Sequence, residues 1–261
     1  MKVRPRQLRK AMIVSDTPRV ERVRHESKRR RLNVARIERL PPKMVRVVLS
    51  GEELRGFVSL GFDDHVKVFF PSAMRDFTPR RFDAKAGELW IDFFVHEGGP
   101  AASWAEQATI GQTLEIGGPR GSMVIALDGI DAHVLIGDET ALPAICRRLE
   151  ELPTAVPTLV VIELDPGSER PVLASRSAME VVWVQRDGLA GPPAHEVIEA
   201  LRPLKFPPGH CFVWVASESQ AARAIRGYLR NERGLDKKWI KAAGYWQRGA
   251  EGAHERIPDD D

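Results

Sequence analysis

Residues 75–82 bring an arginine, an aromatic ring and a hydroxyl close together along the chain. The guanidinium of Arg75 suits a pyrophosphate, because its forked donors match paired phosphate oxygens. The ring of Phe77 can stack on a flat heteroaromatic group such as an isoalloxazine, and the Thr78 hydroxyl can hydrogen-bond to its edge. Alternate side chains of an extended segment share a face, so Arg75 and Phe77 can point the same way. Alone, such a cluster is also typical of a solvated strand surface.

A second segment, residues 96–105, has the composition of a turn that leads into a helix. Two glycines allow a positive φ, and Pro100 suits the first position of the helix that follows. The beginning of that helix would present N–H groups to an anion, and Ser103 adds a hydroxyl. An ordinary strand-to-helix turn explains the same residues. Taken with Arg75, Phe77 and Thr78, the segment predicts a two-part site for a diphosphate and a flavin.

Both segments lie in a part of the chain whose sequence pattern is typical of an all-β domain. Short apolar runs from residue 32 to about 128 are separated by Gly, Pro and Asp, and the expected strands are residues 34–40, 43–49, 65–70, 88–95, 113–116 and 122–127. With one short helix near 101–109, this pattern resembles a closed Greek-key barrel without exposed edges. Residues 117–121 form a tight basic corner, where Arg120 either faces a ligand or is simply exposed.

After residue 131 strands and helices alternate, which is typical of a parallel sheet. The expected strands are 133–136, 158–164, 179–184 and 211–216, and the expected helices are 141–151, 194–201 and 218–233. The first strand ends at residues 137–140, a position where open α/β sheets bind nucleotides, although the dinucleotide fingerprint Gly-x-Gly-x-x-Gly is absent from the sequence. Thr140 either caps the helix or hydrogen-bonds to a phosphate or the nicotinamide.

Two pairs of charged residues bear on the choice between NADH and NADPH. Glu163 and Asp165 can hold a ribose 2′-hydroxyl, whereas Arg170 and Arg176 can receive a 2′-phosphate. The sequence leaves both alternatives open.

The segment 238–249 is too aromatic for a simple tail. Trp246 either lies against a flavin ring or is part of the core, and Lys241 and Arg248 add positive charge on either side.

Composition excludes several classes of protein. A chain of 261 residues with 43% hydrophobic residues can build two modest domains. The apolar runs are far shorter than the roughly 20 residues of a membrane helix, and residues 1–31 lack the apolar core of a secretory signal. Cys146 and Cys211 are too few for a disulfide framework, and the seven histidines do not show metal-ligand spacing. We therefore expect a cytoplasmic protein without a metal site.

The charge is concentrated at the N-terminus. Residues 1–31 hold twelve Lys or Arg against three acids, so this part carries +9 while the whole chain carries +3. The run at residues 28–31 has no interleaved aromatic residues, which favours a solvated or partly disordered arm over a nucleic-acid contact. The acidic C-terminus is expected to be a disordered tail.

As a set, several segments resemble the siderophore-interacting protein family of flavin-dependent ferric-siderophore reductases, a branch of the ferredoxin-reductase-like flavoenzymes. The matching segments are residues 62–71, 75–80, 92–105, 117–121, 137–144 and 244–249, in the family's order over roughly residues 30–250. The chain departs from the family pattern twice. Phe77 replaces the usual Tyr, which keeps the ring and removes a hydroxyl, and Ser217 replaces a Gly that allows close approach of a nicotinamide nucleotide.

The resemblance implies a division into four parts. These are a basic, flexible arm (1–28), an FAD-binding barrel (29–130), an NAD(P)H-binding α/β domain with a C-terminal aromatic strand (131–250) and a tail (251–261). It also implies a set of cofactor-binding residues: His65, Lys67, Arg75, Phe77, Thr78, Arg80, Asp92, Val95, His96, Gly99, Pro100, Ala101, Ser103, Trp104, Asp138, Thr140, Ala141 and Trp246. Arg120, Lys241 and Arg248 are the expected contacts to an anionic ferric siderophore.

The function implied by the resemblance is electron transfer from NAD(P)H through FAD to the Fe(III) of a siderophore, which releases Fe(II). This reaction requires no protein nucleophile, so we expect no catalytic side chain. Two alternatives stay open: a general flavin or quinone reductase, and a siderophore-binding flavoprotein without turnover, which Ser217 makes conceivable. The sequence does not distinguish catecholate from hydroxamate siderophores, and it predicts neither the oligomeric state nor the purpose of the basic arm.

Overall fold

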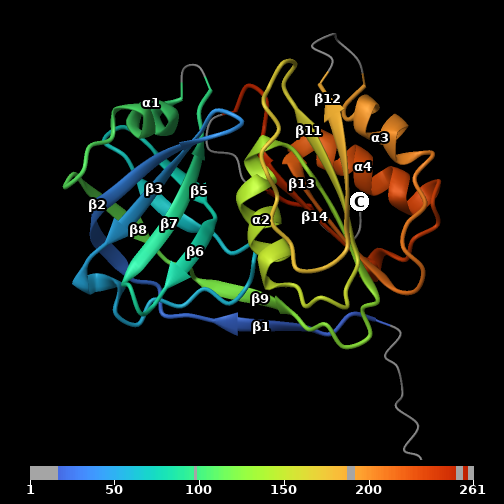
Figure 1. The fold of residues 1–261 in the computed structure, drawn as a ribbon, viewed down its shortest axis with the longest axis horizontal. Coiled ribbons are helices and arrows are strands. Elements are labelled where there is room, and N and C mark those ends of the chain that lie inside the picture. The colour runs from blue at the N-terminus through green and yellow to red at the C-terminus, as the bar shows by residue number, and fades with distance from the viewer. Residues whose placement is uncertain (1–16, 97–98, 187–191, 251–254, 258–261) are drawn as a thin grey trace, which may run out of the picture.

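The structure, a computed structural model, describes residues 17–96, 99–186, 192–250 and 255–257. It consists of a curled antiparallel sheet beside a layered α/β unit (Figure 1). None of the described helices is both long enough and apolar enough to cross a membrane.

The first unit is a seven-stranded antiparallel sheet in the order β5-β4-β8-β2-β3-β7-β6. Its strands are β2 (Arg29–Leu40), β3 (Met44–Ser50), β4 (Val66–Phe69), β5 (Met74–Phe77), β6 (Pro79–Asp83), β7 (Glu88–Phe94) and β8 (Thr113–Gly117). A single residue, Thr78, separates the two edge strands β5 and β6, so the sheet must curl until its edges approach each other. Val47, Leu49, Leu89 and Ile91 are fully buried inside this barrel.

The expected barrel is therefore present, but its ladder is not closed, because β5 and β6 remain the two ends of the sheet. The sequence pattern missed β5 and β6 because each is very short. The short 3₁₀ helix η1 (Glu52–Leu54) follows β3, and the helix α1 (Pro100–Gln107) follows β7 with Pro100 at its first position, as predicted.

The predicted strand at 122–127 does not join the barrel. It is β9 (Gly121–Ile125), and it pairs with β1 (Val20–Arg24) in a separate two-stranded ribbon. Part of the expected flexible arm 1–28 is thus a β-strand, while residues 1–16 lie outside the described residues. The basic run at 28–31 is not wholly solvated either: Arg30 is buried and donates to the carbonyl oxygens of Glu53 (3.0 Å) and Gly118 (3.1 Å).

The second unit is a six-stranded sheet in the order β12-β11-β10-β13-β14-β15, parallel except for β15. Its strands are β10 (Ala132–Gly137), β11 (Thr158–Leu164), β12 (Met179–Gln185), β13 (Cys211–Glu218), β14 (Ile240–Trp246) and β15 (Glu255–Arg256). Continuous apolar runs form the central strands because both faces are covered. The prediction of an antiparallel barrel followed by a parallel α/β sheet is confirmed.

Helices cover the two faces of this sheet. α2 (Leu142–Glu151) packs on the face toward the barrel, whereas α3 (His195–Leu201) and α4 (Ser219–Asn231) pack on the other (Figure 1). Two short 3₁₀ helices, η2 (Glu139–Ala141) and η3 (Lys237–Trp239), precede α2 and β14. The expected tail 251–261 contains β15, which pairs with β14, and the side chain of Ile257 is buried. The domain boundary between residues 130 and 131 stays a prediction.

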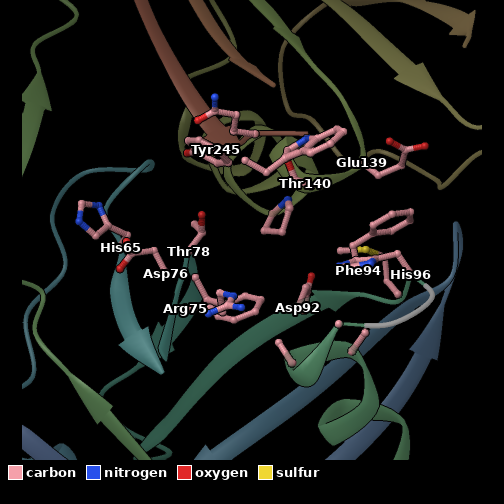
Figure 2. A pocket seen from close by; sticks show the side chains of 18 of the residues that line it. His65, Arg75, Asp76, Thr78, Asp92, Phe94, His96, Glu139, Thr140 and Tyr245 are labelled. Carbon is pink, nitrogen blue, oxygen red and sulfur yellow. The ribbon is translucent and has the colours of Figure 1, made fainter. Parts of the chain in front are cut away.

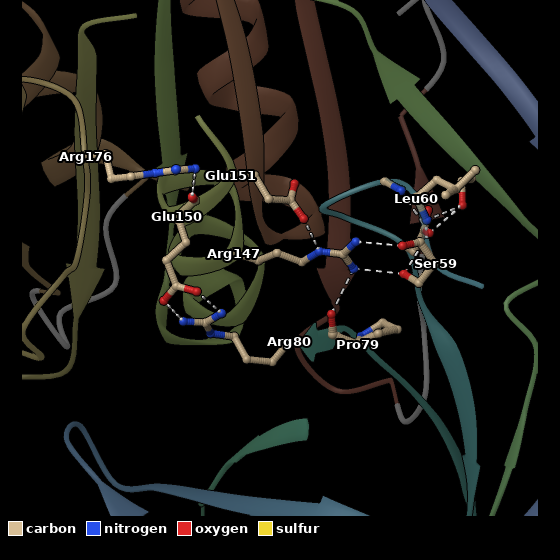
Figure 3. Close-up of polar contacts among 11 residues, drawn as sticks. Ser59, Leu60, Pro79, Arg80, Arg147, Glu150, Glu151 and Arg176 are labelled. Atoms are coloured by element: carbon tan, nitrogen blue, oxygen red, sulfur yellow. Dashed lines mark hydrogen bonds and ion pairs between the residues drawn. The ribbon is translucent and has the colours of Figure 1, made fainter. Parts of the chain in front are cut away.

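One buried guanidinium joins α2 to the barrel side (Figure 3). Arg147 donates to the Ser59 hydroxyl (2.8 Å), the Ser59 carbonyl (2.9 Å) and the Pro79 carbonyl (2.9 Å), and its Nε donates to Glu151 (2.7 Å). One turn further along α2, Glu150 pairs with Arg80 of β6. These contacts fix the distance between the two units.

We predict that Arg147→Met lowers the free energy of unfolding by about 2–4 kcal/mol, because three acceptors on the barrel side lose a charged donor. Urea denaturation followed by circular dichroism measures the change. Arg55→Met is the matched control, because Arg55 is exposed and its side chain pairs with the exposed Glu52. Similar, small losses in both variants would contradict the assigned role of Arg147.

Candidate functional site

A cavity of about 710 Å³ lies between the barrel and the α/β unit (Figure 2). The barrel contributes the end of β5 and the beginning of α1, and the α/β unit contributes the residues after β10 and the end of β14. Its volume is in the range of ligand pockets. Twelve of the residues predicted to bind cofactor or substrate line it: His65, Arg75, Phe77, Thr78, Asp92, His96, Gly99, Pro100, Ala101, Thr140, Trp246 and Arg248.

The Arg75 segment forms one wall of this cavity. Arg75 is half-buried in β5, and its Nη1 donates to the Met74 carbonyl (3.1 Å). The Phe77 ring lies 4.5 Å from the ring of Phe93, so it lines the cavity and also packs on the barrel core. Thr78 is buried, and its side chain hydrogen-bonds with the hydroxyl of Tyr245 from β14. The barrel wall and the last long strand of the α/β sheet are therefore joined at the cavity.

The beginning of α1 forms a second wall. The helix has no side-chain cap, because Gly99 occupies the N-cap position, and the first N–H groups of a helix have no intrahelical acceptor. Gly99 lets the His96 ring pack closely against the turn: a Cβ there would lie 2.6 Å from Cε1 of His96, and the ring would have to shift. Residues 97 and 98 of this turn lie outside the described residues. The first turn of α1 can accept an anion, as the sequence predicted.

A single buried carboxylate organises the opposite wall. Asp138 accepts hydrogen bonds from the backbone N–H (2.9 Å) and hydroxyl (2.5 Å) of Thr140 through Oδ1. Its Oδ2 accepts from Nε1 of Trp246 (2.8 Å). Asp138, and not Thr140, is therefore the cap of the turn that begins the helix, which corrects the simpler of our two interpretations of Thr140. Thr140 and Trp246 face the cavity in positions that Asp138 sets.

Two residues that were predicted to bind the cofactor form ion pairs with other residues of the protein. Both oxygens of Asp92 accept hydrogen bonds from Arg46, at 2.7 and 2.8 Å, so this carboxylate helps to hold the cavity wall together. Arg80 lies outside the cavity and pairs with Glu150, and its buried Nε has no hydrogen-bond acceptor within the described residues. Although burial opposes it, the hydrogen bond to Glu150 holds the pKa of Arg80 above its ordinary value.

Several other predicted residues do not reach the cavity. Val95 and Trp104 pack on the barrel core, and the Trp104 ring lies 5.7 Å from Phe70 and from Phe93. Ser103 is exposed, and Ala141 is buried in the core of the α/β unit. Ser103, Trp104 and Ala141 follow cavity residues on a helix or turn, where the next side chains point elsewhere. Ser217 is buried, and its hydroxyl donates to the Glu218 carbonyl (3.3 Å).

A second cavity of about 720 Å³ adjoins the first and shares Asp63, His65 and Tyr245 with it. Lys237, Lys238 and Lys241 line this second cavity. Lys241 lies 2.5 Å from Asp63, which also accepts from Nε1 of Trp214 (3.0 Å). Although burial raises it, the charge of Lys241 and these hydrogen bonds hold the pKa of Asp63 below its ordinary value. Arg120 lies outside both cavities, on the exposed corner beside Gly121.

The sequence reasoning missed part of the cavity wall. The cavity is also lined by Tyr245, Asp63, Asp76, Phe94 and Glu139, which the sequence analysis did not assign to the site. Burial raises the pKa of Tyr245 well above its ordinary value, so its hydroxyl stays protonated. Asp76, Phe94, Glu139 and Tyr245 each adjoin a predicted residue along the chain, which is the signal that would have found them. Asp63 lies two residues before the predicted His65.

The donors and acceptors of the first cavity fit a flavin nucleotide. Arg75 and the first turn of α1 provide positive charge for a diphosphate, and Phe77 and Trp246 provide flat surfaces. Lys67 lies outside the cavity and donates to Oδ2 of Asp76 (2.7 Å). The other oxygen, Oδ1, is buried without a donor among the described residues. Because a buried acceptor without a partner is costly, Asp76 is suited to a hydroxyl or N–H group of a ligand.

Comparisons with known proteins agree with this chemistry. The profile of the siderophore-interacting protein family matches residues 130–249, and that of the siderophore-interacting FAD-binding domain matches 33–74 and 71–123. An NADPH-dependent ferric-chelate reductase of Escherichia coli is 34% identical, covering 89% of this chain and 99% of the relative. The ferric vibriobactin reductase ViuB of Vibrio cholerae is 32% identical, covering 84% and 90%. The structure of a siderophore utilization protein from T. fusca superposes with a TM-score of 0.82 at 36% identity, covering 90% and 98%.

We predict that Asp138 and Trp246 are energetically coupled. Asp138→Ala should lower the free energy of unfolding by about 1–3 kcal/mol, because it removes both the cap and the acceptor for Trp246. In a double-mutant cycle with Trp246→Phe, measured by urea denaturation, the interaction energy should be about 1 kcal/mol. The exposed Asp128 provides the control cycle, in which Asp128→Ala and Trp246→Phe should be additive. Additivity in both cycles would contradict the anchoring of Trp246.

Proposed function

The chain belongs to the siderophore-interacting protein family, and on that premise we propose that it is an FAD-dependent reductase that passes electrons from NAD(P)H to the Fe(III) of a siderophore. The observation that carries the proposal is the composition of the first cavity. One wall is the arginine-bearing barrel strand and the beginning of α1, and the other is the carboxyl edge of a parallel sheet. A flavin bound at the one wall and a nucleotide bound at the other would therefore share one space.

On the barrel side, Arg75 and the first turn of α1 would hold the FAD diphosphate through charge-assisted hydrogen bonds. Phe77 and Trp246 would enclose the ring system, and Asp76 would accept a hydrogen bond from the bound group. The bound flavin would supply the conversion of a two-electron hydride transfer into the one-electron steps that iron requires. The protein's part is to bind, to orient and to exclude water.

On the other side, the residues after β10 would receive the electron donor. Open α/β sheets bind nucleotides at the carboxyl ends of their strands, and Thr140 lies at such an end with its hydroxyl at the cavity. Asp138 keeps Thr140 in place, so the donor would meet a fixed hydroxyl.

The second cavity is the proposed place for the ferric siderophore. Its lysines attract an anionic chelate, and it adjoins the first cavity at Tyr245 and Asp63. Lys241 is partly neutralised by Asp63, so Lys238 and the neighbouring Arg248 carry more of the attraction. Arg120 remains a proposed contact for the part of a large chelate that extends beyond the cavity.

The reductase is proposed to act in the cytoplasm, on siderophores that have already been imported. Fe(III) is bound tightly by the hard oxygen donors of catecholates and hydroxamates, and reduction to Fe(II) weakens those bonds. A general flavin or quinone reductase would share the first cavity. The basic residues of the second cavity favour an anionic acceptor over a neutral quinone.

We predict that Arg75→Ala raises the dissociation constant of FAD roughly ten- to a hundredfold, because two charge-assisted hydrogen bonds to the diphosphate are lost. Fluorescence titration of the apoprotein with FAD measures the change. Arg81→Ala, a half-exposed arginine outside the cavity, should bind FAD like the unaltered protein. Unchanged affinity in Arg75→Ala would remove Arg75 from the diphosphate site.

We predict that Arg248→Ala raises KM for an anionic ferric tris-catecholate about three- to tenfold, because a charge at the rim of the site is removed. KM for a neutral quinone should barely change. Steady-state assays with both acceptors measure the difference, and Lys205→Ala, an exposed charge outside both cavities, is the control. Equal effects on the two acceptors would place Arg248 outside the substrate site.

A further inference from the structure

Three neighbouring strands of the α/β sheet place charged residues at one end of the first cavity. β10, β11 and β12 are adjacent and parallel, so their carboxyl ends meet at the same edge. Glu139 follows β10, Asp165 follows β11 and Arg186 follows β12, and all three line the cavity. Glu163, near the end of β11, lies beside them.

The guanidinium of Arg186 is fully engaged by these acids. Its Nε donates to Glu163 (3.0 Å), its Nη2 to Glu139 (2.8 Å) and its Nη1 to Asp165. Glu139 is almost completely buried, with 2% of its side chain exposed, whereas Asp165 is 41% exposed. Glu139 also accepts a hydrogen bond from the backbone N–H of Asp165 (2.5 Å), which fixes the loop after β11. Asp165 is thus the carboxylate of this group that a ligand can reach.

The charge of the group is unfavourable for a phosphate. With all members ionised, three carboxylates surround one guanidinium, and the balance is negative. Arg186 can offer a donor to a phosphate only by giving up a hydrogen bond to one of these carboxylates. Loss of the bond to Glu139 would leave a buried carboxylate without its cation, which is strongly destabilising. Burial raises the pKa of Glu139 and of Glu163, and Arg186 opposes this effect.

The two arginines that the sequence offered as receptors for a 2′-phosphate lie elsewhere. Arg176 donates to the carbonyl oxygen of Glu150 (3.0 Å), as Figure 3 shows. Arg170 lies over the ring of Trp183, 6.0 Å from its centroid. Neither residue lines the first cavity. The sequence left two pairs of residues open as contacts to the ribose. Of these, the acidic pair lies at the end of the first cavity, which Asp165 lines.

We propose that Glu139, Glu163, Asp165 and Arg186 form a ribose-reading cluster that selects NADH over NADPH. The inference rests on the proposed function, in that the electron donor is a pyridine dinucleotide. A carboxylate at the end of the second strand accepts hydrogen bonds from an adenosine ribose diol, and Asp165 holds that position. A 2′-phosphate would replace a donor hydroxyl with a dianion beside three carboxylates, which the cluster disfavours. The chain would thereby differ from its Escherichia coli relative, which is named for NADPH.

Fragments of the two dinucleotides test the cluster without any turnover. Isothermal titration of the FAD-loaded protein with 5′-AMP and with adenosine 2′,5′-bisphosphate compares ligands that differ only in the 2′-phosphate. We expect 5′-AMP to bind on the order of tenfold more tightly. Equal or tighter binding of the bisphosphate overturns the proposal. Failure of both to bind overturns it as well, because the cavity end would then hold no adenosine ribose.

A double variant identifies the residues responsible. Glu163→Gln with Asp165→Asn keeps the side-chain shapes and removes two negative charges, so the preference for 5′-AMP should disappear and the bisphosphate should bind on the order of tenfold more tightly than to the unaltered protein. Glu180→Gln, an exposed charge at the opposite end of β12, should leave both affinities unchanged. An unchanged preference in a folded double variant overturns the assignment. If the double variant does not fold, the titrations of the unaltered protein decide.

Reduction of the bound flavin separates this inference from the proposed function. NADH should give the higher kcat/KM in anaerobic flavin reduction, and the double variant should shift the ratio toward NADPH. If both donors reduce the flavin and NADPH is preferred, the function stands and the cluster's role fails. If 5′-AMP is preferred but neither dinucleotide reduces the flavin, the ribose assignment stands and the proposed function fails.

Discussion

The cavity of this protein is a space between two folding units, so its shape depends on how they are held apart. The buried guanidinium of Arg147 sets that distance through three directed hydrogen bonds to Ser59 and Pro79. Directional bonds to fixed backbone carbonyls restrict the position of α2 far more closely than apolar packing alone. Because α2 follows directly from the residues at the nucleotide end, the same contact also places Thr140 opposite the barrel strand that carries Arg75.

A second constraint comes from buried carboxylates at the sheet edge. Asp138 links the end of β10 to Trp246 of β14, and Asp63 links Trp214 of β13 to Lys241 of β14. Charged groups are buried at a cost unless they are paired. Asp138 follows the carboxyl end of β10, where open α/β sheets bind ligands. Asp63 precedes β4 and approaches the parallel sheet from the barrel side. The two cavities therefore share a wall whose side chains are held in fixed orientations.

The sequence predicted those parts of the site that depend on local chemistry. Arg75, Phe77 and Gly99 were identifiable because residue type and spacing determine the side of a strand or the start of a helix. The parallel strands were equally evident, since continuous apolar runs such as Val134 to Ile136, alternating with helices, are typical of a sheet covered on both faces. Short or interrupted strands such as β1, β5, β6 and β15 carry too few residues for a pattern.

Long-range pairing explains the remaining errors. Arg120 looked suitable for an anion, but its corner turns toward the β1–β9 ribbon, a partner that the sequence did not reveal. Ser103 was assigned for its hydroxyl near the beginning of the helix and Trp104 from the family resemblance, but a helix points successive side chains in different directions. The partners of Arg147 and Arg186 lie far away in sequence, and only the folded chain brings them together.

Two adjoining cavities would bring a pyridine dinucleotide, a flavin and a ferric chelate next to one another, in the order in which electrons pass. The most direct test is a single anaerobic experiment on the FAD-loaded protein, with absorbance recorded while NADH and then a ferric tris-catecholate are added. We expect NADH to bleach the flavin, and the chelate to restore its colour while about two Fe(II) form per NADH consumed. A flavin that NADH bleaches but the chelate does not restore, or one that NADH leaves unchanged, would contradict the account.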